Sequence, residues 1–353
     1  MPSKNILIIA MILSIMTTAA VSNNTIYSTS IDASSNVTNI NPNSTSPGIN
    51  NVSNLNVERD LDIASLPLSN GTEVIKNGTL LIDGLNVPIK YEQINGLKIL
   101  EGDILLSAQV IDNKAALDKF IITGKWTNGE IPYIIDSRFP NPKLIEEAIA
   151  DVKSDLPRLL FREANITPNG QIADSHYLNF IYEANDASVC MTFAGMLPNT
   201  HPLFKGTIDL PNGIYGDKQY HGQPVIIGDG CSKGNVIHEI GHTLGLWHEQ
   251  TRCDRNQHIE IDELNIKPNK VGQYIAKCSP AEPTKSPTDN GTPYDYCSIM
   301  HYPRGGMNAI DPTKPIMTPI EPVVGCKDIG QRNGFSPIDI QAINSVYRFL
   351  GFH

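Results

Sequence analysis

The sequence predicts an α+β fold, because strand-like segments come first in the C-terminal part of the chain and helices dominate later. The chain has 353 residues, of which 40% are hydrophobic and 18% are charged. This composition permits a sizeable buried core and argues against a wholly disordered chain. Changes in composition divide the chain into four segments, and the sequence contains no internal repeat.

Residues 1–22 have the layout of a secretory signal peptide. Lys4 precedes the apolar run Ile6–Met16, and Ala20-Val21-Ser22 fits a small-x-small cleavage site. The run is too short to span a membrane, which takes roughly 20 apolar residues, and no later stretch is long enough. We therefore expect a secreted, extracellular product with no membrane attachment once the signal is removed.

Residues 23–59 read as a disordered linker. Of the 34 residues from 23 to 56, 21 are Asn, Ser or Thr, which leaves too little apolar surface to offset the chain entropy. Asn-x-Ser/Thr triplets would accept glycans in a eukaryotic secretory pathway, but they also arise by chance in an Asn-rich sequence. They begin at Asn23, Asn36, Asn43, Asn51, Asn70, Asn77, Asn165 and Asn290.

Residues 60–124 form a small unit without cysteine. Its strand-like pieces, Thr79–Ile82 and Ile104–Leu106, are separated by Asn-Gly and Asp-Gly turns. This unit precedes the candidate catalytic and metal-binding motifs described below.

Residues 125–353 form the main domain. Asn141 and Pro142 open a helix, as cap and first-turn residue, that runs to about Ser154. Ser336 and Asp339 form a capping pattern for a last helix, which should end near Leu350-Gly351. Strands are predicted at residues 130–136, 159–161 and 177–182.

The charge and the cysteines restrict the environment and the partners. There are 27 Lys and Arg against 37 Asp and Glu, so the net charge is −10, and the chain is a poor non-specific binder of nucleic acid. The six cysteines begin at Cys190. Their number is even, so all of them can pair in an oxidising compartment.

One short segment carries the strongest chemical signal. His238 and His242 are four residues apart, so on a helix they point the same way and can hold one Zn²⁺. Glu239 is rotated about 100° from His238, where its carboxylate can take a proton from a metal-bound water. Gly245 can end the helix in a left-handed conformation. His248 can then return as a third ligand, which leaves one coordination position for water.

The alternative is that these histidines lie on a solvated helix face. The full H-E-x-x-H-x-x-G-x-x-H pattern fixes five positions, and its chance occurrence is on the order of one in ten million per starting position. The pattern is described for metzincins, which also have a downstream Met-turn. Ser298-Ile299-Met300-His301-Tyr302 supplies a candidate turn, although a lone Met is more often ordinary core packing.

With these motifs the sequence resembles the astacin family of zinc endopeptidases, which belongs to the metzincin clan. Members share H-E-x-x-H-x-x-G-x-x-H-E and S-x-M-H-Y, and both are intact here. The resemblance covers roughly Trp126 to Leu350, including similar stretches at 249–255, 329–332 and 336–340. It implies a two-lobed metzincin-type catalytic domain with an N-terminal mixed sheet and helices and the zinc helix at the cleft. The C-terminal lobe would be mainly irregular and end in a helix, and a small propeptide unit would precede the domain.

The resemblance assigns roles position by position. It makes His238, His242 and His248 the ligands of one zinc ion and Glu239 the general base. Tyr302 matches a tyrosine that ligates zinc at rest, as a fifth ligand, and swings to stabilise the oxyanion during catalysis.

Two further positions match the family's supporting residues. Met300 matches the Met-turn, which forms an apolar floor beneath the metal. Glu249 matches a residue that anchors the new N-terminus after activation.

The small unit also gains a meaning from the resemblance. Leu100-Glu101-Gly102-Asp103-Ile104 is similar to the Phe-x-Gly-Asp-Ile motif of astacin propeptides, in which the Asp binds zinc in place of the catalytic water. Asp103 would then keep a zymogen latent. The alternative is that Asp103 is an ordinary solvent-exposed acidic residue in a turn. Activating cleavage should fall between Leu106 and Trp126. Possible points for a trypsin-like protease are Lys114, Lys119 and Lys125.

The cysteines depart in part from the family pattern. Cys190 and Cys231 match one of the two usual disulfides, and the other pair has no counterpart. The remaining four cysteines allow three pairings, and we favour Cys253–Cys297, which would tie the segment after the third ligand to the Met-turn, together with Cys278–Cys326. Residues 277–293 look like an inserted Pro/Thr/Ser-rich loop close to the Met-turn.

These observations predict a secreted, monomeric zinc metalloendopeptidase made as a zymogen. Its partners would be protein or peptide substrates and an activating protease, with no nucleic acid. A catalytically silent, secreted zinc-fold binding protein is the alternative, but it predicts a broken motif and none is visible. A glycosylated, Asn-rich surface or matrix protein would explain residues 23–56 and nothing after Lys125.

Overall fold

The computed structural model describes residues 73–94, 97–106, 118–121, 124–184, 188–197, 208–209, 219–220, 222–283 and 285–348. The predicted signal peptide, the linker and most of the expected cleavage segment lie outside the described residues. Among the residues that are described, no helix is long and apolar enough to cross a membrane.

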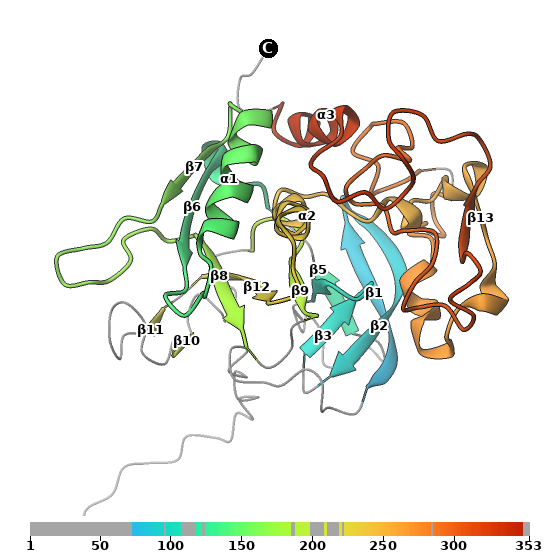
Figure 1. The fold of residues 1–353 in the computed structure, drawn as a ribbon, viewed down its shortest axis with the longest axis horizontal. Helices are drawn as coiled ribbons and strands as arrows, with labels where there is room; N and C mark the ends of the chain where they lie inside the picture. Colours follow the sequence, from blue (N-terminus) through green and yellow to red (C-terminus); the bar gives the residue numbers. More distant parts are fainter. Residues whose placement is uncertain are drawn as a thin grey trace, which may run out of the picture. The chain divides into compact units, whose positions relative to one another are not determined.

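One mixed sheet organises the described residues (Figure 1). It has ten strands in the order β5-β1-β2-β3-β4-β9-β12-β8-β6-β7. Their bounds are β1 (Val74–Ile82), β2 (Leu85–Ile94), β3 (Leu97–Leu100), β4 (Ile104–Leu105), β5 (Asp118–Ile121), β6 (Glu130–Ile135), β7 (Leu160–Glu163), β8 (Leu178–Glu183), β9 (Cys190–Phe193) and β12 (Gln223–Gly228).

Smaller elements complete the described fold. Two short antiparallel pairs are β10 (Ile208–Asp209) with β11 (Gln219–Tyr220), and β13 (Ile259–Ile261) with β14 (Met317–Pro319). The α-helices are α1 (Lys143–Asp155), α2 (Lys233–Thr243) and α3 (Pro337–Val346). Short 3₁₀ helices are η3 (Thr127–Gly129), η5 (Glu249–Thr251), η6 (Arg255–Gln257), η7 (Glu263–Asn265) and η8 (Pro268–Tyr274).

The main core lies between α1, α2 and one face of the strands β6, β7, β8 and β12. α1 buries a single stripe spaced i, i+3, i+4 and i+7, as an amphipathic helix does, namely Ile145, Ala148, Ile149 and Val152. α2 lies against β9 and β12 and is buried almost all round (Figure 1). The zinc-motif helix is therefore fixed at the centre of the domain.

The predicted helix ends differ slightly from the structure. No side-chain hydrogen bond caps the start of α1; Pro142 has helical φ and ψ angles, as expected of a first-turn residue, and the regular helix begins at Lys143. Ser336 caps α3 as predicted, through a capping box with Asp339. α3 ends at Val346 rather than near residue 350, because Tyr347 leaves helical geometry and buries its ring.

The N-terminal strands continue the sheet of the main domain. We call the described residues 73–94, 97–106 and 118–121 the N-terminal cover. β4 pairs in parallel with β9, with Ile104 opposite Thr192 and Leu105 opposite Phe193. The cover has its own apolar cluster, which is completed by Ala194 and Trp247 of the main domain. The cover thus occupies the edge of β9, next to α2.

The part after α2, drawn in orange and red in Figure 1, is mainly irregular. It holds a separate apolar cluster around Ile259, Tyr274, Ile316 and Met317.

The disulfides correct one prediction. The structure contains the expected Cys190–Cys231 bond, but it pairs Cys253 with Cys278 and Cys297 with Cys326. The predicted pairs Cys253–Cys297 and Cys278–Cys326 are wrong. Lys277 N donates to Thr251 O (2.7 Å), which brings the two chain segments together and leaves the Cα atoms of Cys253 and Cys278 5.0 Å apart, well within disulfide range.

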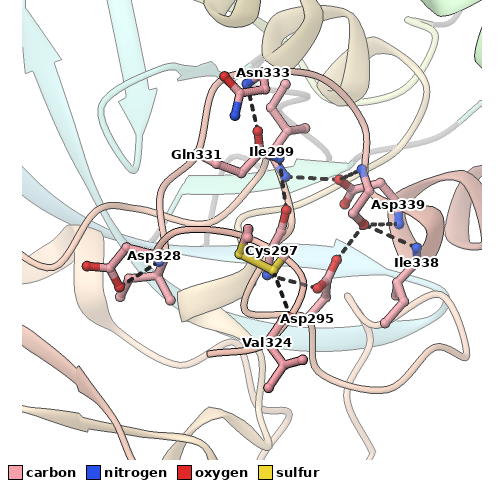
Figure 2. Close-up of a disulfide and its surroundings, with 12 residues drawn as sticks. Asp295, Cys297, Ile299, Val324, Asp328, Gln331, Asn333, Ile338 and Asp339 are labelled. Carbon is pink, nitrogen blue, oxygen red and sulfur yellow. Dashed lines mark hydrogen bonds between the residues drawn. A yellow bond between two sulfur atoms is a disulfide. The ribbon is translucent and has the colours of Figure 1, made fainter. Parts of the chain in front are cut away.

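The Cys297–Cys326 bond ties the approach to the Met-turn to the segment that leads into α3. Figure 2 shows this disulfide beside Asp295 and Asp339, with Gln331 Nε2 donating to Cys297 O (2.8 Å). The chain here is fixed by one covalent bond and several hydrogen bonds instead of by regular secondary structure.

Candidate metal centre

The sequence of α2 explains how this helix begins and ends. Ser232 Oγ accepts a hydrogen bond from Asn235 N (3.2 Å), and Asn235 Oδ1 accepts one from Ser232 N (3.0 Å), which satisfies free N–H groups of the first turn. Gly245 follows the last turn with φ +102°, in the left-handed region that favours glycine. The chain reverses there and brings His248 back towards the helix.

Three imidazole nitrogens and one carboxylate converge on a single point. His238 Nε2 lies 3.2 Å from His248 Nε2. Asp103 Oδ2 lies 3.3 Å from His238 Nε2 and 3.1 Å from His248 Nε2, and Asp103 Oδ1 lies 3.7 Å from His242 Nε2. One ligand atom of each residue lies within 4.8 Å of the others. The structure thus brings together the three predicted ligands and the predicted zymogen ligand.

Each imidazole is oriented through its other nitrogen. The partners of the Nδ1 atoms are Ile299 O for His238 (2.8 Å), Leu246 O for His242 (2.9 Å) and Glu101 Oε2 for His248 (2.8 Å). All three partners are acceptors, so each Nδ1 carries the proton and each Nε2 directs its lone pair at the common point. This is the usual arrangement of metal-ligating histidines.

The donor set fits a zinc ion. His242 Nε2 and Asp103 Oδ1 are buried without a hydrogen-bond partner among the described residues, as expected for atoms that face a metal. Burial lowers the pKa of His238 to about 4 and that of His242 well below its ordinary value, which keeps both imidazoles in the neutral form that binds metals. Three imidazole nitrogens with one open position for a carboxylate or water suit Zn²⁺.

Glu239 lies beside the metal ligands but does not join them. It is 1% exposed, and its Oε2 has no hydrogen-bond partner among the described residues. Burial, assisted by the negative charge of Asp103, raises the pKa of Glu239 well above its ordinary value. A buried carboxyl with a raised pKa next to a metal can exchange a proton with a bound water.

The Tyr302 ring stacks edge-on against His248, with 4.8 Å between the ring centroids. Its hydroxyl donates a hydrogen bond to Glu101 O and lies 3.5 Å from Gln273 Oε1. In this form, the hydroxyl therefore contacts the N-terminal cover, and its predicted role as a fifth ligand stays a prediction.

The Met-turn lies beneath α2. Met300 is 1% exposed, and a Cβ atom added to Gly241 would lie 2.8 Å from Met300 Sδ, so the glycine allows this close contact. Asp339 holds the turn by accepting hydrogen bonds from Ser298 Oγ (2.6 Å) and Ile299 N (2.9 Å). Burial raises the pKa of Asp339 to about 6.

Glu249 directly follows the third histidine in the chain. It accepts hydrogen bonds from Asp295 N (2.7 Å) and Arg252 Nη1 (3.2 Å), and burial raises its pKa to about 8. A cavity of about 20 Å³ adjoins it, lined also by Trp247 and Asp295.

A cleft of about 600 Å³ opens beside the metal ligands. Asp103, Glu239, Tyr302 and Arg332 contribute to its lining. Arg332 Nη1 donates to Ile299 O (2.8 Å), the same oxygen that accepts from His238. The cleft is therefore continuous with the chemical groups of the site.

The structure adds three residues to which the sequence analysis gave no role at the site: Glu101, Lys277 and Arg332. Glu101 contacts His248, and Lys277 Nζ forms an ion pair with Glu101 Oε1. Glu101 could have been suspected, because it lies within the motif that contains Asp103. Lys277 gave no signal, because it is 29 residues beyond His248 in an irregular loop.

An H-E-x-x-H helix that brings three imidazoles together beside a buried glutamate defines the class of zinc metalloproteinases. Residues 183–348 match the family model of the peptidase family described as Astacin. Slightly less than half of the chain therefore matches the astacin family model, as the sequence predicted, and zinc is the metal that the names of its relatives print.

Several curated relatives are similar to parts of this chain. Zinc metalloproteinase nas-13 of Caenorhabditis elegans is 40% identical over 127 residues, 35% of this chain and 26% of the relative. Bone morphogenetic protein 1 homolog of Strongylocentrotus purpuratus is 30% identical over 231 residues, which are 64% of this chain and 30% of the relative. Low choriolytic enzyme of Oryzias latipes is 41% identical over 138 residues, which are 38% of this chain and 45% of the relative. The chain thus spans less than half the length of these relatives.

Among solved structures, one example is also similar to this chain. It is high choriolytic enzyme 1, a hatching enzyme zinc-protease from Oryzias latipes, with a TM-score of 0.47 and 25% identity. The similarity covers 69% of this chain and 99% of that one.

Proposed function

We propose that this chain is a secreted zinc metalloendopeptidase that is made as a zymogen. Residues 125–353 would be the catalytic domain and residues 60–124 the propeptide. The observation that carries the proposal is the carboxylate of Asp103, which lies among the three histidine Nε2 atoms. A carboxylate at this point takes the coordination position that a nucleophilic water needs.

The residues of the chain divide the chemistry among them. A zinc ion held by the three histidines would polarise the scissile carbonyl and lower the pKa of a bound water. Glu239 takes a proton from the attacking water and passes it to the leaving amine. The Tyr302 hydroxyl donates a hydrogen bond to the oxyanion that develops on the substrate.

The cover blocks this chemistry in two further ways. It holds the Tyr302 hydroxyl through Glu101 O, so that this donor is not free for an oxyanion. β4 also occupies the edge of β9, where an extended substrate could pair by strand addition. Removal of the cover would free the zinc position, the tyrosine and the strand edge together.

The surroundings of Glu249 support a role in activation. The small cavity beside it is lined by Glu249 and by three further acidic residues, Asp289, Asp295 and Asp339, a setting that would favour a new N-terminal ammonium group. Glu249 would anchor that group after cleavage between Leu106 and Trp126.

The full-length protein, before and after a trypsin-like protease, tests the proposal with casein as substrate. We expect hydrolysis only after processing, and its loss when a zinc chelator is added. Asp103→Ala should free the zinc position but leave Tyr302 and the edge of β9 covered, so it should give at most weak hydrolysis before processing. Zinc binding without turnover in the processed protein would favour the alternative, a silent zinc-fold binding protein.

A further inference from the structure

The N-terminal cover reaches the metal centre with two separate carboxylates. Asp103 lies at the metal position, whereas Glu101 lies behind it, on the far side of the His248 ring. Glu101 and Gly102 both have positive φ angles, +54° and +85°. This turn directs the two acidic side chains to different atoms of the same imidazole, Glu101 to Nδ1 and Asp103 to Nε2.

The left-handed backbone conformation is unfavourable for a residue with a Cβ atom, so the contacts of Glu101 must hold it there. Its side chain is 1% exposed. Oε2 accepts from His248 Nδ1 (2.8 Å) and lies 3.4 Å from Thr251 Oγ1, while Oε1 pairs with Lys277 Nζ. Both carboxylate oxygens are therefore engaged by the main domain.

The surroundings of Lys277 suit an ion pair with this carboxylate. Its side chain is 2% exposed, and Nζ also donates to Thr251 Oγ1 (2.7 Å) and lies 5.2 Å from the centre of the Trp247 ring. A buried charge must be paired. In the described part of the chain, the carboxylate that pairs with Lys277 comes from the cover.

The three metal ligands differ in where their orienting groups come from. His238 and His242 are held by backbone carbonyls of the main domain, Ile299 O and Leu246 O. His248 is held by a side chain of the cover. The proposed cleavage would leave the first two hydrogen bonds in place and remove the third.

We propose that Glu101 is a positioning residue for the third zinc ligand, so that the cover completes the zinc site that it also blocks. The inference rests on the proposed zymogen and deepens it. A carboxylate on the distal nitrogen of a ligating imidazole fixes the ring and raises its basicity, and the loss of such a partner typically weakens metal binding about 10- to 100-fold. Zinc is then held more tightly before cleavage than Asp103 alone would achieve, and zinc uptake is favoured in the latent protein.

The test measures zinc affinity of the intact, unprocessed protein by competition with a chromophoric chelator. We expect Glu101→Ala to raise the zinc dissociation constant about 10- to 100-fold and Glu101→Gln to raise it less, because Gln keeps an acceptor without the charge. Cobalt in place of zinc gives a second readout, since its visible absorption bands should change in both variants when the His248 ring is no longer fixed.

Glu92→Gln is the matched control. Glu92 is also a buried carboxylate of the cover that pairs with a lysine of the main domain, Lys270, but its partners Lys270 and Gln273 are not metal ligands. If Glu92→Gln weakened zinc binding as much as Glu101→Gln, the effect would come from loosening the cover, and the inference would be wrong. Thermal unfolding of each metal-free variant identifies any that fail to fold.

The outcomes separate this inference from the proposed function. If the wild-type protein does not bind zinc, or if His238→Ala leaves zinc binding unchanged, the metal centre itself is wrong. If wild-type zinc binding depends on His238 but is unaffected by Glu101→Ala, the metal centre stands and the role of Glu101 is overturned.

Discussion

The two sides of the metal centre are held in different ways. On the main-domain side, α2 is fixed by a large apolar core and by backbone hydrogen bonds to His238 and His242. On the cover side, short strands add an apolar contact, and three acidic side chains, Asp103, Glu101 and Glu92, meet polar groups of the main domain. The apolar core gives stability, whereas buried charge pairs give less net stability and fix geometry. A cover held in this way has a defined position, and the proposed cleavage would still allow its removal.

The largest expected effect tests the main-domain side. Glu239→Gln keeps the size of the side chain but removes the proton acceptor, so kcat of the processed protein should fall about 10²- to 10⁴-fold. Zinc content should stay unchanged, because Glu239 does not belong to the cluster of ligand atoms. Casein hydrolysis and metal analysis of the same preparation check both points. Full activity in the variant would remove Glu239 from the mechanism.

The next largest effects are expected from core substitutions, which should change the free energy of unfolding differently in the main domain and in the cover. Phe180 is fully buried in the main core, and Phe180→Ala should lower the free energy of unfolding by about 3–5 kcal/mol in both the full-length and the processed protein. Leu80 is fully buried in the cover. Leu80→Ala should lower the stability of the full-length protein by about 2–5 kcal/mol and leave the processed protein unchanged.

Chemical denaturation of the two forms gives these values. An effect of Leu80→Ala on the processed protein would mean that the cover remains part of the folded enzyme. Equal unfolding of full-length wild type and Phe180→Ala would contradict the placement of the main core.

The parts of the site that are predictable from sequence are the local ones. The i, i+4 spacing of His238 and His242 and the cap at Ser336 need only neighbouring residues, and the structure has both. The cysteine pairing depends on which distant segments meet. The Thr251–Lys277 backbone hydrogen bond brings Cys253 and Cys278 together, and no pattern in the sequence predicts this contact. The ion pair of Glu101 with Lys277 joins residues 176 positions apart, so only the fold reveals it.

A pH-dependent effect is expected at the Met-turn. Burial raises the pKa of Asp339 from an ordinary 3.8 to about 6 in the folded protein, so between these values the folded state keeps a proton that the unfolded state has lost. The stabilising contribution of this proton is present below about pH 4 and is lost as the pH rises to about 6, a change of about 3 kcal/mol. Asp339→Asn cannot titrate, so its stability should fall less between pH 4 and pH 6.

Denaturation of both proteins across this range measures the difference between the two curves, in which the other titrating groups cancel. Parallel curves would contradict the raised pKa of Asp339.

The smallest expected effect concerns the outer rim of the cover. Lys270 Nζ lies 3.0 Å from Glu92 Oε2 and 3.2 Å from Glu73 Oε1, and its side chain is 22% exposed. Glu92 keeps a second partner in Gln273 Nε2 (2.7 Å), so Lys270→Met leaves this buried carboxylate hydrogen-bonded.

A partly exposed ion pair is screened by water and salt, and Lys270→Met should therefore destabilise the full-length protein by no more than about 1 kcal/mol, and less still at about 1 M salt. Lys143→Met, at an exposed pair with Glu147 on α1, is the control and should have no measurable effect. A loss above about 2 kcal/mol for Lys270→Met would show that charge pairs, and not apolar contacts, supply most of the stability of the cover. That result would reverse the difference between the two sides of the metal centre, because the cover would then be released chiefly by breaking ion pairs.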